Sequence, residues 1–542
     1  MPHISRWVVF SRSTFPTATL LALSACGSGE PPDEPATEAP PARSTAALAE
    51  ALVEAMGGRA ALEAVDTLVL VGEGTRTRMG QIAVTGGEDP VGALAGVTET
   101  IDLANGRAAF DYEVAIGEFR LQRTEVLTSF ESEPVGWNTG PDRPNIAVSP
   151  NGLFSWAAQN SPEMLLRRNV ISVALAAAET ATAEQMAEER VFNGSTSLYG
   201  TATLPSGENV ELYFNPTTGL LDGFATLDTE TMLGDVDAEY ILADYRPVMR
   251  WTTVEGGAQA DGAASAERES EVLLPYSITI RKQGRPYSSM VYNRIDMNPP
   301  DADEIFALPE DIVEQARQVV ATDGPWAPLE WNEVAPGVYH AVGYSHHSMV
   351  VEFPTFVAVV ESPYTEAQAL TLVRRIEEEI NKPIRYVTPT HPHYDHTGGI
   401  RGLAAVGATV LVAEGHEGEL RAIVESPHTN PPDELARALA GGSEVGAVEV
   451  FSGMTVIEEG QRRLELHEVT TIPHVNPMTL AYVPDAGALF ESDLFFGAPG
   501  PDATALYAAI RERGLDVDQI VGGHGGVLPF SALVGAASAA TP

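Results

Sequence analysis

The stretch His-Pro-His-Tyr-Asp-His at positions 391–396 decides the fold of the C-terminal half of this chain. Histidine accounts for only 12 of 542 residues, so three histidines and an aspartate within six positions are not expected by chance. Neutral imidazole and carboxylate groups bind zinc and similar divalent metals. Three apolar residues, Ile384, Tyr386 and Val387, precede the motif, and Gly398 and Gly399 follow it. This pattern predicts ligands gathered where a strand turns into a helix, and therefore a metallohydrolase.

Three more residues with metal-binding side chains follow at the ends of apolar, strand-like runs. His474 comes after residues 464–469, and Asp493 comes after two short runs at 480–483 and 488–490. His524 comes after Ile520 and Val521, inside a glycine-rich turn. Strand ends that share one edge of a sheet bring their following residues together. The sequence therefore predicts that these residues join the motif in one site.

This order of motifs resembles the metallo-β-lactamase superfamily over residues 328–542. The resemblance implies an αββα sandwich with metals at one edge of its two sheets. One departure is Pro473-His474-Val475, where the family usually has Gly-His-Thr or Gly-His-Ser. By resemblance, one metal would be held by His391, His393 and His474, a second by Asp395, His396 and His524, and Asp493 would bridge them. The expected elements here are strands at 331–339, 350–353, 357–361, 384–388 and 410–412 and a helix at 366–381.

Two zinc ions are the expected cofactors, and iron or manganese remain alternatives. Two such ions can share a hydroxide and polarise a carbonyl or phosphoryl oxygen. Asp395 is the candidate catalytic residue, because its carboxylate could pass a proton to the leaving group. The same resemblance implies ester, thioester, lactone or amide hydrolysis, because classical β-lactamases of the superfamily tend to lack an aspartate at the place of Asp493. A redox reaction at an iron centre is a further alternative that the ligand set leaves open.

Length and charge set the broad class of the protein. A chain of 542 residues exceeds what one core usually serves, so at least two domains are expected. The net charge of −43 argues against nucleic acid as a partner, and a small-molecule substrate is expected instead. The oligomeric state is left open by the sequence.

The N-terminus has the pattern of an export signal at residues 1–25. Two arginines precede a short apolar run that ends in Leu-Ser-Ala-Cys, with Cys26 the single cysteine of the chain. This ending resembles the bacterial lipobox and implies lipidation of Cys26, with residues 26–45 as a flexible tether. The predicted location is the cell envelope, at the periplasmic face of the outer membrane. A chance cysteine near a signal peptide is the alternative.

Residues 46–320 are predicted to form a separate, β-rich domain. Residues 46–65 have a helical pattern interrupted by Gly57-Gly58, and residues 161–178 have a second one that opens with Ser161 and Pro162. Alternating strands are expected at 67–74, 97–103, 108–114, 196–203, 209–214, 223–228 and 276–281. The region resembles the lipoprotein-carrier fold, so the whole chain is predicted to be α+β, with an antiparallel half-barrel before the sandwich. Residues 310–328 would link the two.

The remaining candidates lie outside the predicted ligand set. His346, His347 and Tyr394 could line the substrate pocket, although a solvated loop pair and simple packing are the alternatives. His416 and His428 are weaker pocket candidates, and His467 is expected to be structural.

Two functions compete at this stage. One is a membrane-tethered dinuclear metallohydrolase. The other is a lipid- or ligand-binding lipoprotein whose metal domain is not hydrolytic. The complete ligand set favours the first.

Overall fold

The computed structural model describes residues 43–540, apart from 82–86, 117–118, 142, 151–152, 154–168, 206, 231 and 259–263. The predicted signal peptide, Cys26 and nearly all of the predicted tether lie outside the described residues. Within the described part, no helix combines the length and the apolar character that crossing a membrane requires.

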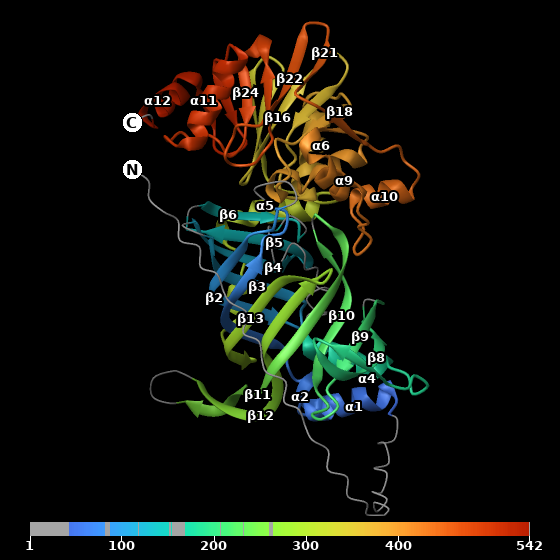
Figure 1. The fold of residues 1–542 in the computed structure, drawn as a ribbon. Coiled ribbons are helices and arrows are strands. Elements are labelled where there is room, and N and C mark those ends of the chain that lie inside the picture. The colour runs from blue at the N-terminus through green and yellow to red at the C-terminus, as the bar shows by residue number, and fades with distance from the viewer. Residues whose placement is uncertain are drawn as a thin grey trace, which may run out of the picture. The chain divides into compact units, whose positions relative to one another are not determined.

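A large antiparallel sheet occupies the N-terminal region. Its 13 strands run in the order β6-β5-β4-β3-β2-β1-β13-β12-β11-β10-β9-β8-β7 (Figure 1). The bounds are β1 Thr67–Thr77, β2 Val91–Asp102, β3 Arg107–Ile116, β4 Phe119–Phe130, β5 Glu133–Gly140, β6 Arg143–Val148, β7 Glu188–Phe192, β8 Ser195–Thr203, β9 Asn209–Phe214, β10 Leu221–Glu230, β11 Gly234–Ala258, β12 Ala264–Lys282 and β13 Arg285–Met297. The sheet does not close into a barrel, which confirms the predicted half-barrel.

Helices α1 (Thr45–Ala55), α2 (Arg59–Glu63) and α4 (Val170–Thr180) lie against one face of this sheet. Their apolar side chains share one core with inward-facing strand residues such as Leu212 and Phe214. The predicted break between α1 and α2 is confirmed. Gly57 has φ +128°, and a Cβ there would lie 2.5 Å from the Glu271 carbonyl oxygen. Only glycine fits this position without a shift of the backbone.

Only the later part of the predicted helix at 161–178 falls within the described residues. Residues 161–168 lie outside the described residues, and α4 starts at Val170. Asn169 is its N-cap, and the side-chain oxygen of Asn169 accepts from the backbone N–H groups of Ile171 and Ser172. Asn169 is therefore the N-cap of α4, and the predicted cap at Ser161 lies outside the described residues.

The opposite face of the same sheet carries the segment that follows β13. This segment contains the 3-10 helices η2 (Ala302–Phe306) and η3 (Glu310–Ile312) and the helix α5 (Val313–Ala321). Ile312, Ala316 and Val319 pack with Val135 and Trp137 of β5 in a separate small core. The segment predicted as a linker thus starts with a helix that covers the sheet.

Two further sheets make up the C-terminal region. The first has the order β14-β15-β16-β17-β18-β19-β20 and the second β21-β22-β23-β24-β25-β26. The bounds of the first are β14 Leu329–Ala335, β15 Val338–Gly343, β16 His347–Glu352, β17 Val357–Val360, β18 Ile384–Thr388, β19 Thr409–Ala413 and β20 Val448–Phe451. Those of the second are β21 Met454–Glu459, β22 Arg462–Val469, β23 Met478–Val483, β24 Ala488–Glu491, β25 Gln519–Gly522 and β26 Val527–Pro529. A buried core that includes Met349, Val360, Leu466 and Phe490 joins their inner faces.

Helices cover the outer face of each C-terminal sheet. On the first sheet these are α6 (Glu366–Glu379), α8 (Ile400–Ala405), α9 (Glu417–Glu425) and α10 (Glu434–Ala440), which share a core with its strands. On the second sheet they are α11 (Pro501–Arg513) and α12 (Phe530–Ala540); Figure 1 shows both beside β24. The order helix, sheet, sheet, helix confirms the predicted αββα sandwich. The domain limits at 320 and 328 stay predictions, since residues 43–542 form one compact unit.

Candidate metal centre

All seven predicted ligands lie just after strand ends. His391 and His393 follow β18, and Asp395 and His396 lie in the one-turn helix α7 (Tyr394–Thr397). His474 follows β22, and His524 follows β25. Asp493 follows β24 with φ +65°, a left-handed conformation that is uncommon for aspartate. The topology therefore brings residues more than 130 positions apart to one place.

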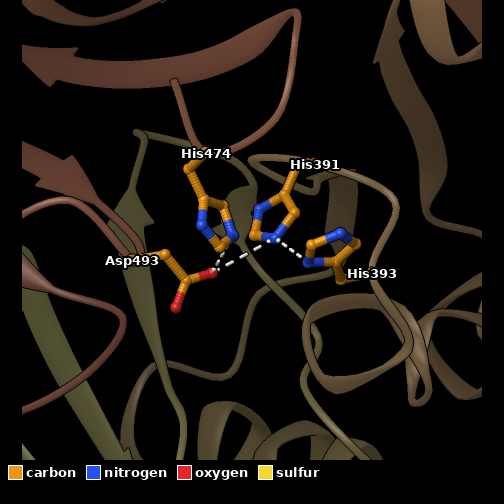
Figure 2. A group of neighbouring side chains, drawn as sticks. All are labelled: His391, His393, His474 and Asp493. Carbon is orange, nitrogen blue, oxygen red and sulfur yellow. Dashed lines mark hydrogen bonds and ion pairs between the residues drawn. The ribbon is translucent and has the colours of Figure 1, made fainter. Parts of the chain in front are cut away.

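His391, His393, His474 and Asp493 form the first cluster (Figure 2). One ligand atom from each of these residues lies within 4.8 Å of the others. Asp493 Oδ2 is 3.2 Å from both His391 Nε2 and His474 Nε2. His391 Nε2 and His393 Nδ1 are 2.9 Å apart. Three imidazole nitrogens and one carboxylate oxygen thus converge, a donor set that suits zinc.

The second predicted set adjoins the first through the same carboxylate. His396 Nε2 lies 2.9 Å from Asp493 Oδ2, and His524 Nε2 lies 2.7 Å from Asp493 Oδ1. Asp395 Oδ2 lies 3.8 Å from His396 Nε2. Asp493 therefore contacts both sets, as a bridging ligand would.

The side chains fit a bound cation. The Nε2 atoms of His396, His474 and His524 are buried, and among the described residues they have no hydrogen-bond partner. A neutral imidazole that points its lone pair at a carboxylate is repelled by it, and a cation bound between the groups would remove this repulsion. Burial favours the neutral form of Asp493, but His396, His391 and His474 outweigh it and hold the Asp493 pKa well below its usual range. These residues would hold the metal ions.

Glu361 supports the site, although it was not among the site residues predicted from the sequence. It follows β17, is fully buried and accepts from the backbone N–H and the hydroxyl of Thr390. Its other oxygen, Oε2, lies 2.6 Å from His396 Nδ1 and 3.2 Å from Ser492 Oγ. A carboxylate on Nδ1 leaves Nε2 of His396 free to bind metal. The available signal was an acidic residue at the end of an apolar strand.

A turn after β1 also reaches the metal loop and was not foreseen. The Gln81 side-chain amide donates to Asp395 Oδ1 at 2.5 Å, and the Gly80 carbonyl accepts from the Tyr394 backbone N–H at 3.1 Å. Burial lowers the pKa of the Arg78 guanidinium, but the neighbouring Tyr394 and Asp395 outweigh this effect, and the pKa is raised. The N-terminal sheet therefore contributes polar contacts to Asp395 that no local sequence pattern reveals.

The predicted pocket residues have different surroundings. His346 is buried with Nε2 3.2 Å from Asp395 Oδ2, and burial lowers its pKa to about 3. His347 is also buried, with its ring 5.1 Å from that of His340. Burial raises the pKa of Tyr394, whose neighbours are Asp395 and Arg78.

The remaining histidines have structural partners. His416 Nε2 lies 2.6 Å from the Pro477 carbonyl oxygen, and His428 Nε2 lies 3.2 Å from Ser426 Oγ. His467 Nε2 lies 3.0 Å from a Glu465 carboxylate oxygen. His428 also lines the large cavity described next.

Solvent reaches the metal centre beside His474, whose side chain is 30% exposed. Phe496 is 62% exposed, and its ring lies 5.3 Å from that of His524. This exposed aromatic residue offers an apolar contact next to the ligands. Separately, a cavity of about 780 Å³ is lined by Arg78, Tyr112, Tyr394 and residues of α8 and α10, but by none of the seven ligands.

The comparisons with known proteins agree with the fold. A sequence model of the metallo-beta-lactamase superfamily matches residues 341–524. Residues 341–524 are therefore similar in sequence to members of that superfamily.

Solved structures resemble the same region only weakly. A metallo-beta-lactamase from Pontibacter korlensis is 19% identical with a TM-score of 0.31, and the match covers 39% of this chain and 98% of that one. One from Hirschia baltica is 18% identical with a TM-score of 0.30, covering 40% and 99%. FIM-1 from Pseudomonas aeruginosa in the mono-zinc form is 17% identical with a TM-score of 0.29, covering 40% and 98%.

Proposed function

We propose that this protein is a dinuclear metal-dependent hydrolase that cleaves an ester, thioester, lactone or amide. One observation carries the proposal. The carboxylate of Asp493 lies within 3.2 Å of nitrogens from four histidines, three of which are buried without hydrogen-bond partners among the described residues. Two divalent ions held there would supply a water nucleophile at neutral pH and polarise the bond to be cleaved.

Three side chains near the metal centre have separate roles in the proposed reaction. Glu361 holds the proton of His396 on Nδ1, which keeps Nε2 available at the site. The Asp395 side chain is only 15% exposed, and the Gln81 amide donates to its Oδ1. In this position Asp395 could take a proton from the nucleophile and deliver it to the leaving group. Phe496 would contact an apolar part of the substrate at the open side of the site.

Metal analysis and a substrate panel test this proposal together. We expect about two zinc-like ions per chain and turnover of at least one ester, lactone or thioester. Asp395→Asn should lower that turnover by about 10²–10⁴-fold, the usual contribution of a positioned acid–base group. His467→Gln is the matched control, because His467 pairs with Glu465 away from the ligands. Unchanged turnover in Asp395→Asn, or a metal content near zero after metal-replete expression, would contradict the proposal.

We also propose that a lipid on Cys26 tethers the protein to the bacterial envelope. The lipobox-like ending Leu-Ser-Ala-Cys and the Pro- and Glu-rich residues that follow support this proposal.

A second candidate is a ligand-binding lipoprotein whose metal domain is not hydrolytic. The cavity of about 780 Å³ favours it, since its volume falls in the usual range of small-molecule sites. A second cavity, on the N-terminal sheet, has about 80 Å³ and is too small for a lipid tail. Metal-loaded protein that binds ligands but hydrolyses no member of the panel would support this candidate.

A further inference from the structure

His346 lies in the short connection between β15 and β16, and its position is fixed from two sides. Gln368 of α6 donates its side-chain amide to the His346 carbonyl oxygen at 2.8 Å. The backbone N–H of His347 donates to the Gly523 carbonyl oxygen at 2.9 Å, which ties the connection to the turn that carries His524. The side chain of His346 is only 5% exposed. This ring is therefore held in place by the fold.

The ring of His346 faces the second half of the metal centre. Its centroid lies 3.7 Å from the ring of His524 and 5.0 Å from the ring of His396. One nitrogen of each of these three histidines lies within 4.8 Å of the others. His346 Nε2 also lies 3.2 Å from Asp395 Oδ2. Three imidazoles therefore come together, and the Asp395 carboxylate lies beside His346 and His396.

These separations fit neighbouring ligands of one ion. With bonds of about 2.0–2.1 Å, adjacent ligands of a tetrahedral zinc are roughly 3.3 Å apart, and opposite ligands in other geometries are roughly 4.2 Å apart. The distance from His346 Nε2 to Asp395 Oδ2 matches the first value. The other ring nitrogen, Nδ1, lies 3.1 Å from Ser345 Oγ, so this hydroxyl can accept the Nδ1 proton. That arrangement leaves the Nε2 lone pair directed at the site.

We propose that His346 is a protein ligand of the second metal ion, together with Asp395, His396 and His524. This inference rests on the proposed function, because it needs a metal at that site. The second ion would then have one more protein donor than the first. A site filled by protein donors binds its ion more tightly and leaves fewer positions for water. The first ion, near the partly exposed His474, would keep the position that exchanges with solvent and substrate.

A hydrogen bond alone is the competing explanation. In that case His346 would carry its proton on Nε2 and donate it to Asp395. Such a donor only positions Asp395 and does not need to approach His396 and His524. The closeness of all three imidazoles favours metal ligation.

The experiment counts coordinated imidazoles in the cobalt(II)-loaded full chain by paramagnetic proton NMR. Each imidazole bound through one nitrogen carries an exchangeable, strongly shifted N–H signal on the other. We expect six signals from the unmodified protein, five from the predicted histidine ligands and one from His346. His346→Ala should lose one signal and bind one of its two cobalt ions about 10–100-fold more weakly, with the other affinity unchanged. His467→Gln should keep all six signals.

The unmodified protein alone can overturn the inference. Two bound cobalt ions with five signals would show that His346 does not ligate, and six signals in both proteins would show the same. His346→Gln provides a second variant if His346→Ala does not fold. Failure of the unmodified protein to bind cobalt would refute the proposed function as well, whereas two ions with five signals would refute this inference only.

Discussion

Replacing Glu361 by glutamine should weaken metal binding without a large effect on the metal-free fold. The amide keeps the size and shape of the carboxylate, so the buried space stays filled. The Thr390 backbone N–H is a fixed donor 3.1 Å from Oε1, and it therefore selects the amide oxygen for that side. The amide NH₂ must then face His396 Nδ1, which lies 2.6 Å from Oε2 in the native protein.

This orientation changes the tautomer of His396. Nδ1 has to accept from the new amide, so the ring proton moves to Nε2, the atom 2.9 Å from Asp493 Oδ2. A protonated Nε2 can donate to Asp493 but cannot bind a metal. Loss of a supporting partner of this kind costs about 10–100-fold in metal affinity, or about 1.4–2.7 kcal/mol.

Competition titration with a chromophoric chelator measures this loss, and urea unfolding of metal-free protein measures stability. Ser492→Ala is the matched control. Ser492 Oγ lies 3.2 Å from the same oxygen and 3.3 Å from His396 Nδ1, but the charged Glu361, at 2.6 Å, is the nearer partner of Nδ1 and remains in this variant. We expect the control to change metal affinity by no more than about fivefold, the effect of one ordinary hydrogen bond. Equal affinity of Glu361→Gln and the unmodified protein for both ions would refute the reasoning.

Three other outcomes are expected. Gln81→Ala removes the donor to Asp395 Oδ1 and should weaken one metal site by about 10–100-fold, measured by the same titration; unchanged affinity would show that the contact does not act on the metal. Burial chiefly, with Arg401, lowers the pKa of His428 to about 4, below the unfolded value of about 6.5. The stabilisation by neutral His428 is present above pH 6.5 and is lost as the pH falls towards 4. Over this pH range, the free energy of unfolding of metal-free His428→Gln, measured in urea, should fall by about 2–3 kcal/mol less than that of the unmodified protein. Cys26→Ser should move the protein from the membrane fraction to the soluble fraction, and continued membrane association would contradict the lipid anchor.

The metal centre could be predicted because its ligands carry distinctive side chains in a distinctive order. Histidine and aspartate at the ends of short apolar runs are recognisable without a structure, and the fold brings those positions together. Glu361 was not predicted, because a single glutamate after a strand has the same pattern as an acidic residue on the surface. In the structure Glu361 is fully buried. The contribution of Gln81 to the site could not be predicted from the sequence. Its contact with Asp395 spans 314 positions and depends on how the first sheet meets the metal loop.

The antiparallel type of the N-terminal sheet was predicted, but several of its strands were missed or predicted too short. Strands with clear alternation, such as Asn209–Phe214, were identified, whereas β4 and the long β11 and β12 were missed wholly or in part. β4 contains Arg123 and Glu125, which are buried at 4% and 0% exposure. Charged residues inside a sheet hide the apolar alternation that the prediction needs. Tertiary pairing of such groups overrides the local pattern.

The contact of the Gly80–Gln81 turn with residues 394 and 395 has a thermodynamic consequence. Binding free energies at linked sites are reciprocal, so a ligand that favours one arrangement of Asp395 must favour the matching arrangement of this turn to the same degree. Occupation of the metal centre should therefore slow amide hydrogen exchange at the end of β1, in a part of the chain that supplies no predicted ligand. Conversely, natural sequence changes around Gly80 can tune metal affinity while every ligand stays the same.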